Sequence, residues 1–471
     1  MSNPVAIVWL RRDLRLSDHP ALTAAAQDGA LMPLFILDEQ MEALGAAPRW
    51  RLEQSLKSLA ADLEARGLKL ILRRGDPRAI LTALAQDIGA VSVHWSRLYD
   101  GGSVARDTEV KSALKEAGVS AVSHAGHVLH EPWTVETKTG GFYKVYTPYW
   151  KAVRGADVPE PIGIPDLRAP DTWPESDALE AWQLSADMDR GGAIVATHET
   201  AGEDTARGVL GGFIGSKVED YGTARDKLFV AGTSTLSAHF AWGELSIRTA
   251  WHAAKRKFDE TGSADVETFM KELVWRDFAW HLIYHTPQIE TENWRPEWDG
   301  FPWRGDNEDA ERWRRGLTGE PIVDAGMREM YVTGRMHNRV RMIVACYLTK
   351  HLQTDWRVGL KWFEECLVDH DPASNAMGWQ WSAGSGPDAT PYFRVFNPET
   401  QAEKFDPKGI YRRKWLDSEN SAEAASYFKA VPRSWGLSAA EGRPPRMIDL
   451  KDGRQRALDA YQEFKAQGQT A

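Results

Sequence analysis

Two tryptophans stand two positions apart in the stretch "GWQWSAGSG", residues 378–386, and the carboxylates of "DHDP" lie just upstream. On a helix, residues i and i+2 point to different faces, so one packing surface cannot use both Trp379 and Trp381. An indole is large and flat, which suits it to contact with a flat cofactor or a stacked base. The spacing therefore indicates that the two indoles serve two different surroundings.

A group of hydroxyls stands at the head of a predicted helix in "AGTSTLSAHFAWGELS", residues 231–246. Hydroxyls and the free backbone N–H groups of a helix start make a natural phosphate cradle. Plain capping of the helix explains the same residues, and this motif alone favours that simpler interpretation. The residues are Thr233, Ser234, Thr235 and Ser237.

The segment "KELVWRDFAWHLIYH" reads as a long helix. Glu272 and Trp275 are three positions apart on it, so a carboxylate and an indole share one face. An exposed glutamate above a core tryptophan would give the same pattern, and alone that is the preferred interpretation.

A third segment, "GRMHNRVRM", places Asn338, Arg341 and Met342 on one helix face. Arg341 could pair with Asp369 or Asp371, although two carboxylates beside one arginine are also a common structural network. The histidines nearby, at positions 337 and 370, are not at metal-ligand spacing with any cysteine. We therefore expect no metal site.

The net charge of −10 argues against a protein that coats nucleic acid through its composition alone. Residues 331–350 nevertheless contain Arg335, Arg339, Arg341 and Lys350 and no acid. The segment is either a basic patch on an acidic body or a helix whose arginines pair with acids elsewhere, and the sequence favours neither.

Composition bounds the remaining possibilities. No apolar run approaches the ~18 residues of a membrane span, so we expect no membrane contact. Cys346 and Cys366 are the only cysteines, which predicts buried, reduced thiols and a cytoplasmic protein. Of the 21 tryptophans, 14 lie at or after Trp242, and much of this excess must be core.

Apolar runs and amphipathic patterns alternate over the first 130 residues. "VAIVWL", "LMPLFIL", "LKLILRR" and "VSVHWS" predict buried strands, and helical patterns separate them. This order predicts an α/β domain with a doubly wound parallel sheet at 1–130, without the glycine-rich turn of a standard dinucleotide site. Residues 131–200 are rich in Pro, Gly and acids and predict a linker. Residues 201–471 predict a larger all-helical domain, in which "AGMREMYVTGRMHNRVRMIVACYLTKHL" has the length and periodicity of a helix.

Six motifs occur in the order "RRDLRLSDH", "GTSTLS", "ELVWRDF", "MHNRVRM", "DHDPASNAMGWQW" and "PYFRVFNP". In this order the chain resembles the DNA photolyase/cryptochrome family along nearly its whole length. The family holds FAD, bent, inside a helical domain, so the resemblance implies FAD as the cofactor. Matched motif by motif, its contacts would be Tyr221, Thr233, Ser234, Thr235, Leu236, Ser237, Asn338, Arg341, Asp369, Asp371 and Asn375.

The resemblance also assigns roles near the flavin. Arg341 would pair with Asp369, and Asn375 matches the residue that faces flavin N5, where a neutral amide suits an enzyme that keeps its flavin fully reduced. An indole can lose an electron to a photoexcited flavin and refill from its neighbour. The residues that match the family's electron-transfer chain are Trp379, Trp356 and Trp303.

The activity implied is light-driven repair of cyclobutane pyrimidine dimers in DNA, a carbon–carbon lyase reaction in which excited reduced FAD donates an electron. Photolyases are themselves among the enzymes that extrude their target from the duplex. By resemblance, Trp275 and Trp381 would wall the lesion and Glu272 would hydrogen-bond the bases. The implied catalytic residues are Glu272, Asn338, Met342 and Asn375. Arg225, Arg339 and Arg394 would contact phosphates.

Four positions select among family members. Enzymes that repair (6-4) photoproducts carry histidines where this chain has Asn338 and Met342. Plant-type cryptochromes carry Tyr where Trp381 stands and usually Asp where Asn375 stands, and signalling members tend to have a longer C-terminal tail. These features favour a dimer photolyase over a blue-light sensor that acts through a protein partner.

A second, antenna chromophore is the least defined expectation. Folate-binding relatives carry an Asn-Glu pair ahead of the "ARD" in the first domain, where this chain has Gly102 and Ser103. The antenna would be a deazaflavin, another flavin, a folate held by other contacts, or absent. The implied partner is UV-damaged DNA, and we expect a monomer with no obligate protein partner.

Overall fold

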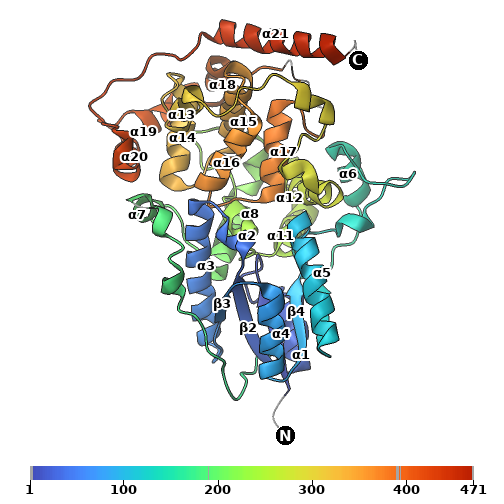
Figure 1. Ribbon diagram of the computed structural model, residues 1–471. Helices are drawn as coiled ribbons and strands as arrows, with labels where there is room; N and C mark the ends of the chain where they lie inside the picture. Colours follow the sequence, from blue (N-terminus) through green and yellow to red (C-terminus); the bar gives the residue numbers. More distant parts are fainter. Residues whose placement is uncertain (1–3, 189, 389–391, 393, 469–471) are drawn as a thin grey trace.

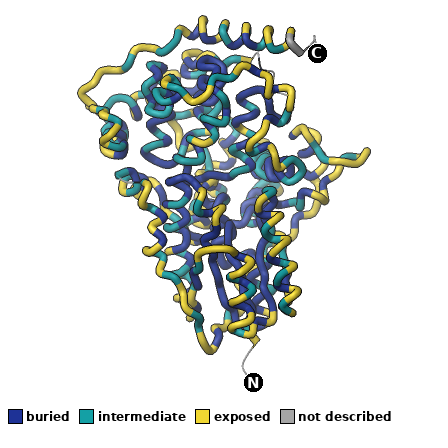
Figure 2. Tube along the Cα trace, viewed as in Figure 1, coloured by how far each residue is buried: buried dark blue, intermediate teal, exposed yellow. Residues whose placement is uncertain are grey.

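A computed structural model describes residues 4–188, 190–388, 392 and 394–468, which leaves two residues of the "PYFRVFNP" motif, 391 and 393, outside the described part. A sheet flanked by helices forms the N-terminal end, and a larger helical body forms the opposite end (Figure 1). Buried backbone runs from the sheet into the helical body (Figure 2). In the described part, no helix is both long and apolar enough to cross a membrane.

Five parallel strands make up the sheet, in the order β3-β2-β1-β4-β5. The four predicted strands are confirmed. The fifth was not predicted, because it lies at the sheet edge and alternates exposed with buried residues in place of a continuous apolar run. The strands are β1 Val5–Leu10, β2 Ala30–Leu37, β3 Ile71–Arg74, β4 Ala90–Ser96 and β5 Ser120–His124.

Helices cover both faces of this sheet, as a doubly wound fold requires. Alternate residues of β1 face opposite layers: Val8 packs in the cluster with α1, Pro20–Asp28, and α3, Ala46–Glu64. Trp9 packs in the cluster with α4, Pro77–Asp87, and α5, Gly101–Glu116. The predicted α/β class is confirmed.

The turn after β1 explains the polar motif "RRDLRLSDH" that stands in place of a glycine-rich loop. Arg12 Nη1 donates to Ala241 O and His370 O at 3.2 Å each, and Arg15 Nη1 donates to Gly243 O at 2.9 Å. These acceptors belong to the helical body. The motif therefore clamps the two parts of the molecule together.

Residues 125–202 are mostly irregular and contain α6, Tyr146–Val153, and α7, Arg190–Val195. Residues 162–177 follow the surface of the sheet layer through hydrogen bonds such as Leu31 N to Arg168 O and Asp177 N to Leu72 O. In contrast, α6 packs against α12, Ala264–His285, and α7 packs against α20, Ala422–Ala430, both in the helical body. The stretch predicted to be a linker is thus ordered by contacts with both parts of the chain.

The helical body contains one departure from the predicted helices. The segment expected to form a single helix at 325–352 breaks at Gly334, whose φ of +69° ends α14, Pro321–Thr333. The chain restarts as α15, Asn338–Cys346, and continues into a π-helical turn, Tyr347–His351. The break makes Asn338 the first residue of a helix.

The helical body contains further helices, of which α21 lies across the end of the molecule farthest from the sheet (Figure 1). They are α8 Glu203–Ser216, α9 Tyr221–Ala224, α10 Ser237–Ala241, α11 Ile247–Thr261, α12 Ala264–His285, α13 Glu308–Arg314, α16 Trp356–Cys366, α17 Pro372–Ala383, α18 Pro398–Phe405, α19 Ile410–Leu416, α20 Ala422–Ala430 and α21 Leu450–Gly468; α2, Glu39–Glu42, belongs to the sheet layer.

Candidate active site

Helix α17 carries both tryptophans of the opening motif. Asp371 caps its start by accepting a hydrogen bond from Ser374 N at 2.8 Å, and Pro372 supplies the first helical φ. Trp379 is 2% exposed and packs in the core of the helical body, whereas Trp381 is half-buried. The predicted divergence of the two indoles is confirmed.

The Trp379 indole occupies a close-fitting niche between α16 and α17. A Cβ at Gly359 would overlap the indole, so α16 approaches this closely only because that residue is glycine. Phe363 meets the indole edge to face, with ring centroids 4.8 Å apart. The indole Nε1 is buried without a hydrogen-bond partner among the described residues.

The two other predicted electron carriers lie in or against the hydrophobic cluster that contains Trp379. Trp356 is fully buried and donates its Nε1–H to Asn293 Oδ1 at 2.9 Å. Trp303 is partly exposed, and its neighbour Arg304 exchanges backbone hydrogen bonds of 2.8 Å with residues 353–355. The cluster thus reaches from the core toward the surface, and electron transfer through it stays a prediction.

An ion pair joins Arg341 of α15 to Asp369, at 2.7 Å. Burial alone would raise the pKa of the Asp369 carboxyl, but Arg341 and a hydrogen bond from Ser237 bring this pKa below its usual range. The carboxylate is therefore ionised at neutral pH. Three predicted cofactor contacts from separate segments meet at this point.

The remaining hydroxyls of the predicted phosphate cradle lie in the loop before α10. Thr235 has a φ of +56°, a left-handed conformation that β-branched residues rarely adopt and that is typical of functional loops. Leu236 and Tyr221 are buried in one hydrophobic cluster. The hydroxyls of Thr233 and Ser234 are half-buried, and those of Thr235 and Ser237 belong to exposed residues.

Asp371 and Asn375 are fixed by the protein itself. Besides capping α17, the Asp371 carboxylate accepts the Trp280 Nε1–H at 3.0 Å. Asn375 donates its Nδ2–H to Leu360 O at 3.2 Å, which orients its carbonyl oxygen away from that backbone group. Both carboxylate oxygens of Asp371 thus accept hydrogen bonds from the protein. In Asn375 the amide nitrogen makes the protein contact, and the side-chain oxygen can act as an acceptor.

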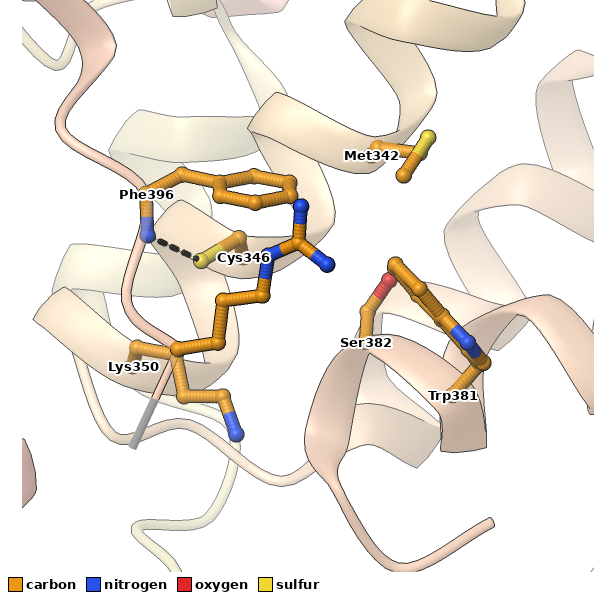
Figure 3. Close-up of a pocket in the computed structure, with 7 residues that line it drawn as sticks. Met342, Cys346, Lys350, Trp381, Ser382 and Phe396 are labelled. Carbon is orange, nitrogen blue, oxygen red and sulfur yellow. Dashed lines mark hydrogen bonds between the residues drawn. The ribbon is translucent and has the colours of Figure 1, made fainter. Parts of the chain in front are cut away.

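A hollow opens between α15 and α17, and Met342 and Trp381 approach it from these two helices (Figure 3). Arg394 lines the same hollow, so three of the residues predicted to act on the lesion or to contact DNA are brought together. We call this site the α15–α17 hollow; its lining residues are Met342, Cys346, Lys350, Trp381, Ser382, Arg394 and Phe396.

The two predicted lesion residues of α12 are engaged with other protein groups. Trp275 stacks on Tyr146 of α6 with ring centroids 3.5 Å apart and planes 8° from parallel. Glu272 forms an ion pair with Arg225. Sequence reasoning missed Tyr146, because it lies 129 positions away from Trp275 and no local spacing connects the two.

Most of the basic residues in 331–350 are paired with acids, which decides between the two interpretations of that segment. Arg339 pairs with Asp226 at 2.7 Å, and Arg335 Nη2 donates to Glu199 Oε2 at 2.7 Å. With the Arg341 pair, all three arginines have acidic partners. The segment is a helix and turn with paired arginines, not a free basic patch. Asn338, at the start of α15, is exposed.

Comparisons with known proteins agree with this arrangement. Residues 6–166 match the family model for DNA photolyase, and residues 269–463 match the model for the FAD binding domain of DNA photolyase. A deoxyribodipyrimidine photo-lyase of Agrobacterium fabrum is 42% identical over 98% of each chain. The chain belongs to the DNA photolyase family.

Two further relatives of this photolyase-family chain illustrate the range of the family. A bacterial class III photolyase from Agrobacterium tumefaciens superposes with a TM-score of 0.91 at 42% identity, over 99% of this chain and 98% of that one. Cryptochrome-2 of Arabidopsis thaliana is 34% identical over 87% of this chain and 70% of its own length. Of these relatives, the class III photolyase is 42% identical to this chain and the cryptochrome 34%.

The residues present fit the cofactor of the family, FAD. The matched FAD binding domain spans 269–463 and contains the Arg341–Asp369 ion pair. The exposed residues Thr235, Ser237 and Asn338 and the half-buried residues Thr233 and Ser234 add polar side chains open to a ligand. No group of His, Cys, Asp or Glu in the described ranges is arranged to hold a metal ion.

The antenna positions of this photolyase-family chain differ from the folate-binding pattern in a physical way. A Cβ at Gly102 would overlap the Gln40 side chain, and Ser103 Oγ lies 3.4 Å from Gln40 Oε1. A larger side chain at position 102 would displace the exposed end of the Gln40 side chain. The identity of an antenna chromophore stays a prediction.

Proposed function

We propose that this chain is a deoxyribodipyrimidine photo-lyase that repairs cyclobutane pyrimidine dimers in UV-damaged DNA, using blue light and reduced FAD. The observation that carries the proposal is the divergence of Trp379 and Trp381 on α17, one into the buried aromatic cluster and one into the α15–α17 hollow. The name of the Agrobacterium fabrum relative supports the reaction. We further propose that the protein works as a cytoplasmic monomer.

Tyr221 and residues from three other segments would hold FAD. The hydroxyls of 233–237 would bind its phosphates and ribose, and Asn338, Arg341 and Asp369 would line the ring system. Once bound and reduced, FAD supplies the electron that excitation by blue light makes available to the dimer. Two contacts hold Arg341 in a fixed orientation. Its guanidinium pairs with the ionised Asp369, and its Nε donates a hydrogen bond to Met336 O at 2.8 Å.

Asn375 would control a proton at flavin N5. Its amide nitrogen is held by Leu360 O, so its carbonyl oxygen is the atom free to accept a hydrogen bond. A carbonyl oxygen stabilises N5 in its protonated form, as an N–H donor. This preference favours the reduced state that repair requires.

The lesion would be held by apolar side chains and by the carboxylate of Glu272, which would hydrogen-bond the bases. Trp381 and Met342 flank the hollow, and Trp275 is held flat by its stack on Tyr146. Stacking on an indole contributes about 1–3 kcal/mol per base. That is enough to offset much of the loss of a weakened base pair when the dimer leaves the duplex.

Phosphate contacts would come from arginines in two different states. Arg394 is exposed and lines the hollow, so it can meet a phosphate directly. Arg225 and Arg339 are already paired with Glu272 and Asp226. Contact with DNA would share or exchange these pairs, which makes Arg394 the largest expected contributor to salt-dependent affinity.

The test is repair of an oligonucleotide that contains one thymine dimer. Blue light with the reduced holoprotein should convert the dimer to two thymines, scored by chromatography, and a dark sample should not. Flavin photoreduction without any repair would refute the proposal and favour a sensor that acts through a protein partner.

A further inference from the structure

The α15–α17 hollow contains one charged residue that neither the sequence motifs nor the proposed roles account for. Lys350 is 2% exposed and lies in the π-helical turn that follows α15. Met342, Cys346 and Lys350 follow one another at four-residue spacing and all line the hollow (Figure 3). Helical π-turns occur frequently at functional sites.

The ammonium group of Lys350 is tied to the two other segments that form the hollow. Its Nζ donates to Ala383 O at 2.7 Å, an acceptor in the last turn of α17, two residues after Trp381. A cation at a helix C-terminus is stabilised by the helix dipole. The same Nζ lies 3.4 Å from the centroid of the Tyr392 ring, in the segment that also carries Arg394 and Phe396.

This residue lacks the partner that a buried lysine usually has. The acidic groups of the described residues contribute nothing to its ionisation, and burial lowers the pKa of Lys350 to about 7, with only Cys346 acting in the opposite direction. Burying an ammonium without a carboxylate is unfavourable. A strongly perturbed ionisable group in a lined hollow is a candidate for a functional role.

We infer that Lys350 is a positioning residue for lesion recognition, which holds the C-terminal end of α17 and the 392–396 segment in register with α15. Through these ties it sets the place of Trp381 relative to Met342 and Arg394. Its contacts are with Ala383 O and the Tyr392 ring, whereas the Trp379 indole packs against Gly359 and Phe363 of α16. The lesion as ligand rests on the proposed function. The contacts by which Lys350 joins α17 and Tyr392 rest on the structure alone.

The test compares the K350M variant with wild type and with T349V, all as the FAD-bound holoprotein. Met preserves the length of the side chain and removes the charge and the donor. Thr349 is fully buried in the same π-turn, bonds only to Ala345 O in its own helix and does not line the hollow, so T349V is the matched control.

K350M should lower the affinity for dimer-containing DNA by about tenfold while the affinity for undamaged DNA and the rate of flavin photoreduction stay within twofold. Hydrogen exchange measured by mass spectrometry should speed up in residues 382–396 of K350M and not in T349V. The K350R variant, which keeps the cation, should restore most of the lesion affinity. Faster exchange with unchanged lesion affinity, or unchanged exchange, would overturn the inference.

Two further outcomes are separable. If K350M does not fold, the Y392L variant removes the ring under the ammonium from the other side and should give the same pattern, and unchanged lesion affinity in Y392L would then overturn the inference. If wild-type protein does not discriminate dimer-containing DNA, the proposed function fails, and the exchange measurement still decides whether Lys350 tethers the three segments.

Discussion

At the scale of single residues, Trp381 has a different surrounding from Trp379 and the other tryptophans of the Trp379 cluster. It is half-buried and faces Met342 and Arg394 across the hollow, while Trp379, two positions earlier, is enclosed by α16. About half a helix turn therefore separates an indole that lines the hollow from an indole in the core. The two predictions that follow separate their roles.

The W381A variant should bind dimer-containing DNA about 5- to 100-fold more weakly, because it loses the stacking of one base on an indole. Its flavin photoreduction should match wild type. Fluorescence anisotropy with damaged and undamaged duplexes measures the change, and equal losses for both duplexes would contradict a role in lesion recognition.

The W379F variant should show photoreduction of the flavin slowed at least tenfold, because phenylalanine is much harder to oxidise than an indole. Its affinity for damaged DNA should stay within twofold of wild type. Absorbance under blue light with an external reductant measures the rate. W251F, in a hydrophobic cluster that does not contain Trp379, is the control; a similar slowing there would remove the special role of Trp379.

At the scale of elements, α12 carries Glu272 and Trp275 of the proposed lesion site and also contacts residues 129–130, which follow the last strand of the sheet. Asp277 is 1% exposed on this helix and accepts hydrogen bonds from Leu129 N and His130 N at 2.9 Å each. Burial raises the pKa of the Asp277 carboxyl to about 7. The carboxyl thus changes charge near neutral pH in the folded state.

The D277N variant should become relatively more stable as the pH rises. The folded pKa of Asp277 is above the unfolded value of about 4, so its favourable contribution is complete below that value and is lost as the pH rises toward 7. Asparagine does not ionise. The difference in Tm between D277N and wild type should shift by roughly 1–3 °C in favour of the variant between pH 5 and 8.

Thermal unfolding followed by circular dichroism at several pH values checks this prediction. D259N, at a half-exposed position on α11, is the control and should leave the pH dependence unchanged. A Tm difference for D277N that is constant between pH 5 and 8 would show that the carboxyl does not titrate in this range.

Element by element, the sequence predicted what local patterns encode. Apolar runs predicted four strands, and their alternation with helical patterns predicted the α/β class. The break at Gly334 was missed because an isolated glycine inside a continuous helical period is tolerated and does not by itself end a helix. The stack of Trp275 on Tyr146 and the pairing of Arg335 with Glu199 join residues more than 100 positions apart, and no local spacing encodes such contacts.

At the scale of the whole molecule, buried charges lock the sheet layer to the helical body. Arg51 of α3 has a fully buried side chain and donates to Glu244 Oε2 at 2.5 Å, and Glu199 lies 3.4 Å away. Glu199 in turn holds Arg335, close to the start of α15. The interface and the candidate site therefore share one network of charges.

The R51M variant should lose about 3–5 kcal/mol of unfolding free energy, because Glu244 and Glu199 would be left buried with fewer positive partners. Denaturant unfolding measures the loss. R74M removes an exposed pair with Glu42 and should change stability by less than about 1 kcal/mol. Equal losses in the two variants would show that the buried network does not stabilise the interface.

The central claim is that α17 serves the flavin with Trp379 and the lesion with Trp381. The most direct measurement is dimer repair under blue light by protein whose FAD has first been reduced chemically with dithionite, so that photoreduction is bypassed. We predict that W379F then repairs at the wild-type rate, whereas W381A, at subsaturating DNA, repairs at least fivefold more slowly. Full repair by W381A, or loss of repair by chemically reduced W379F, would contradict this division of roles.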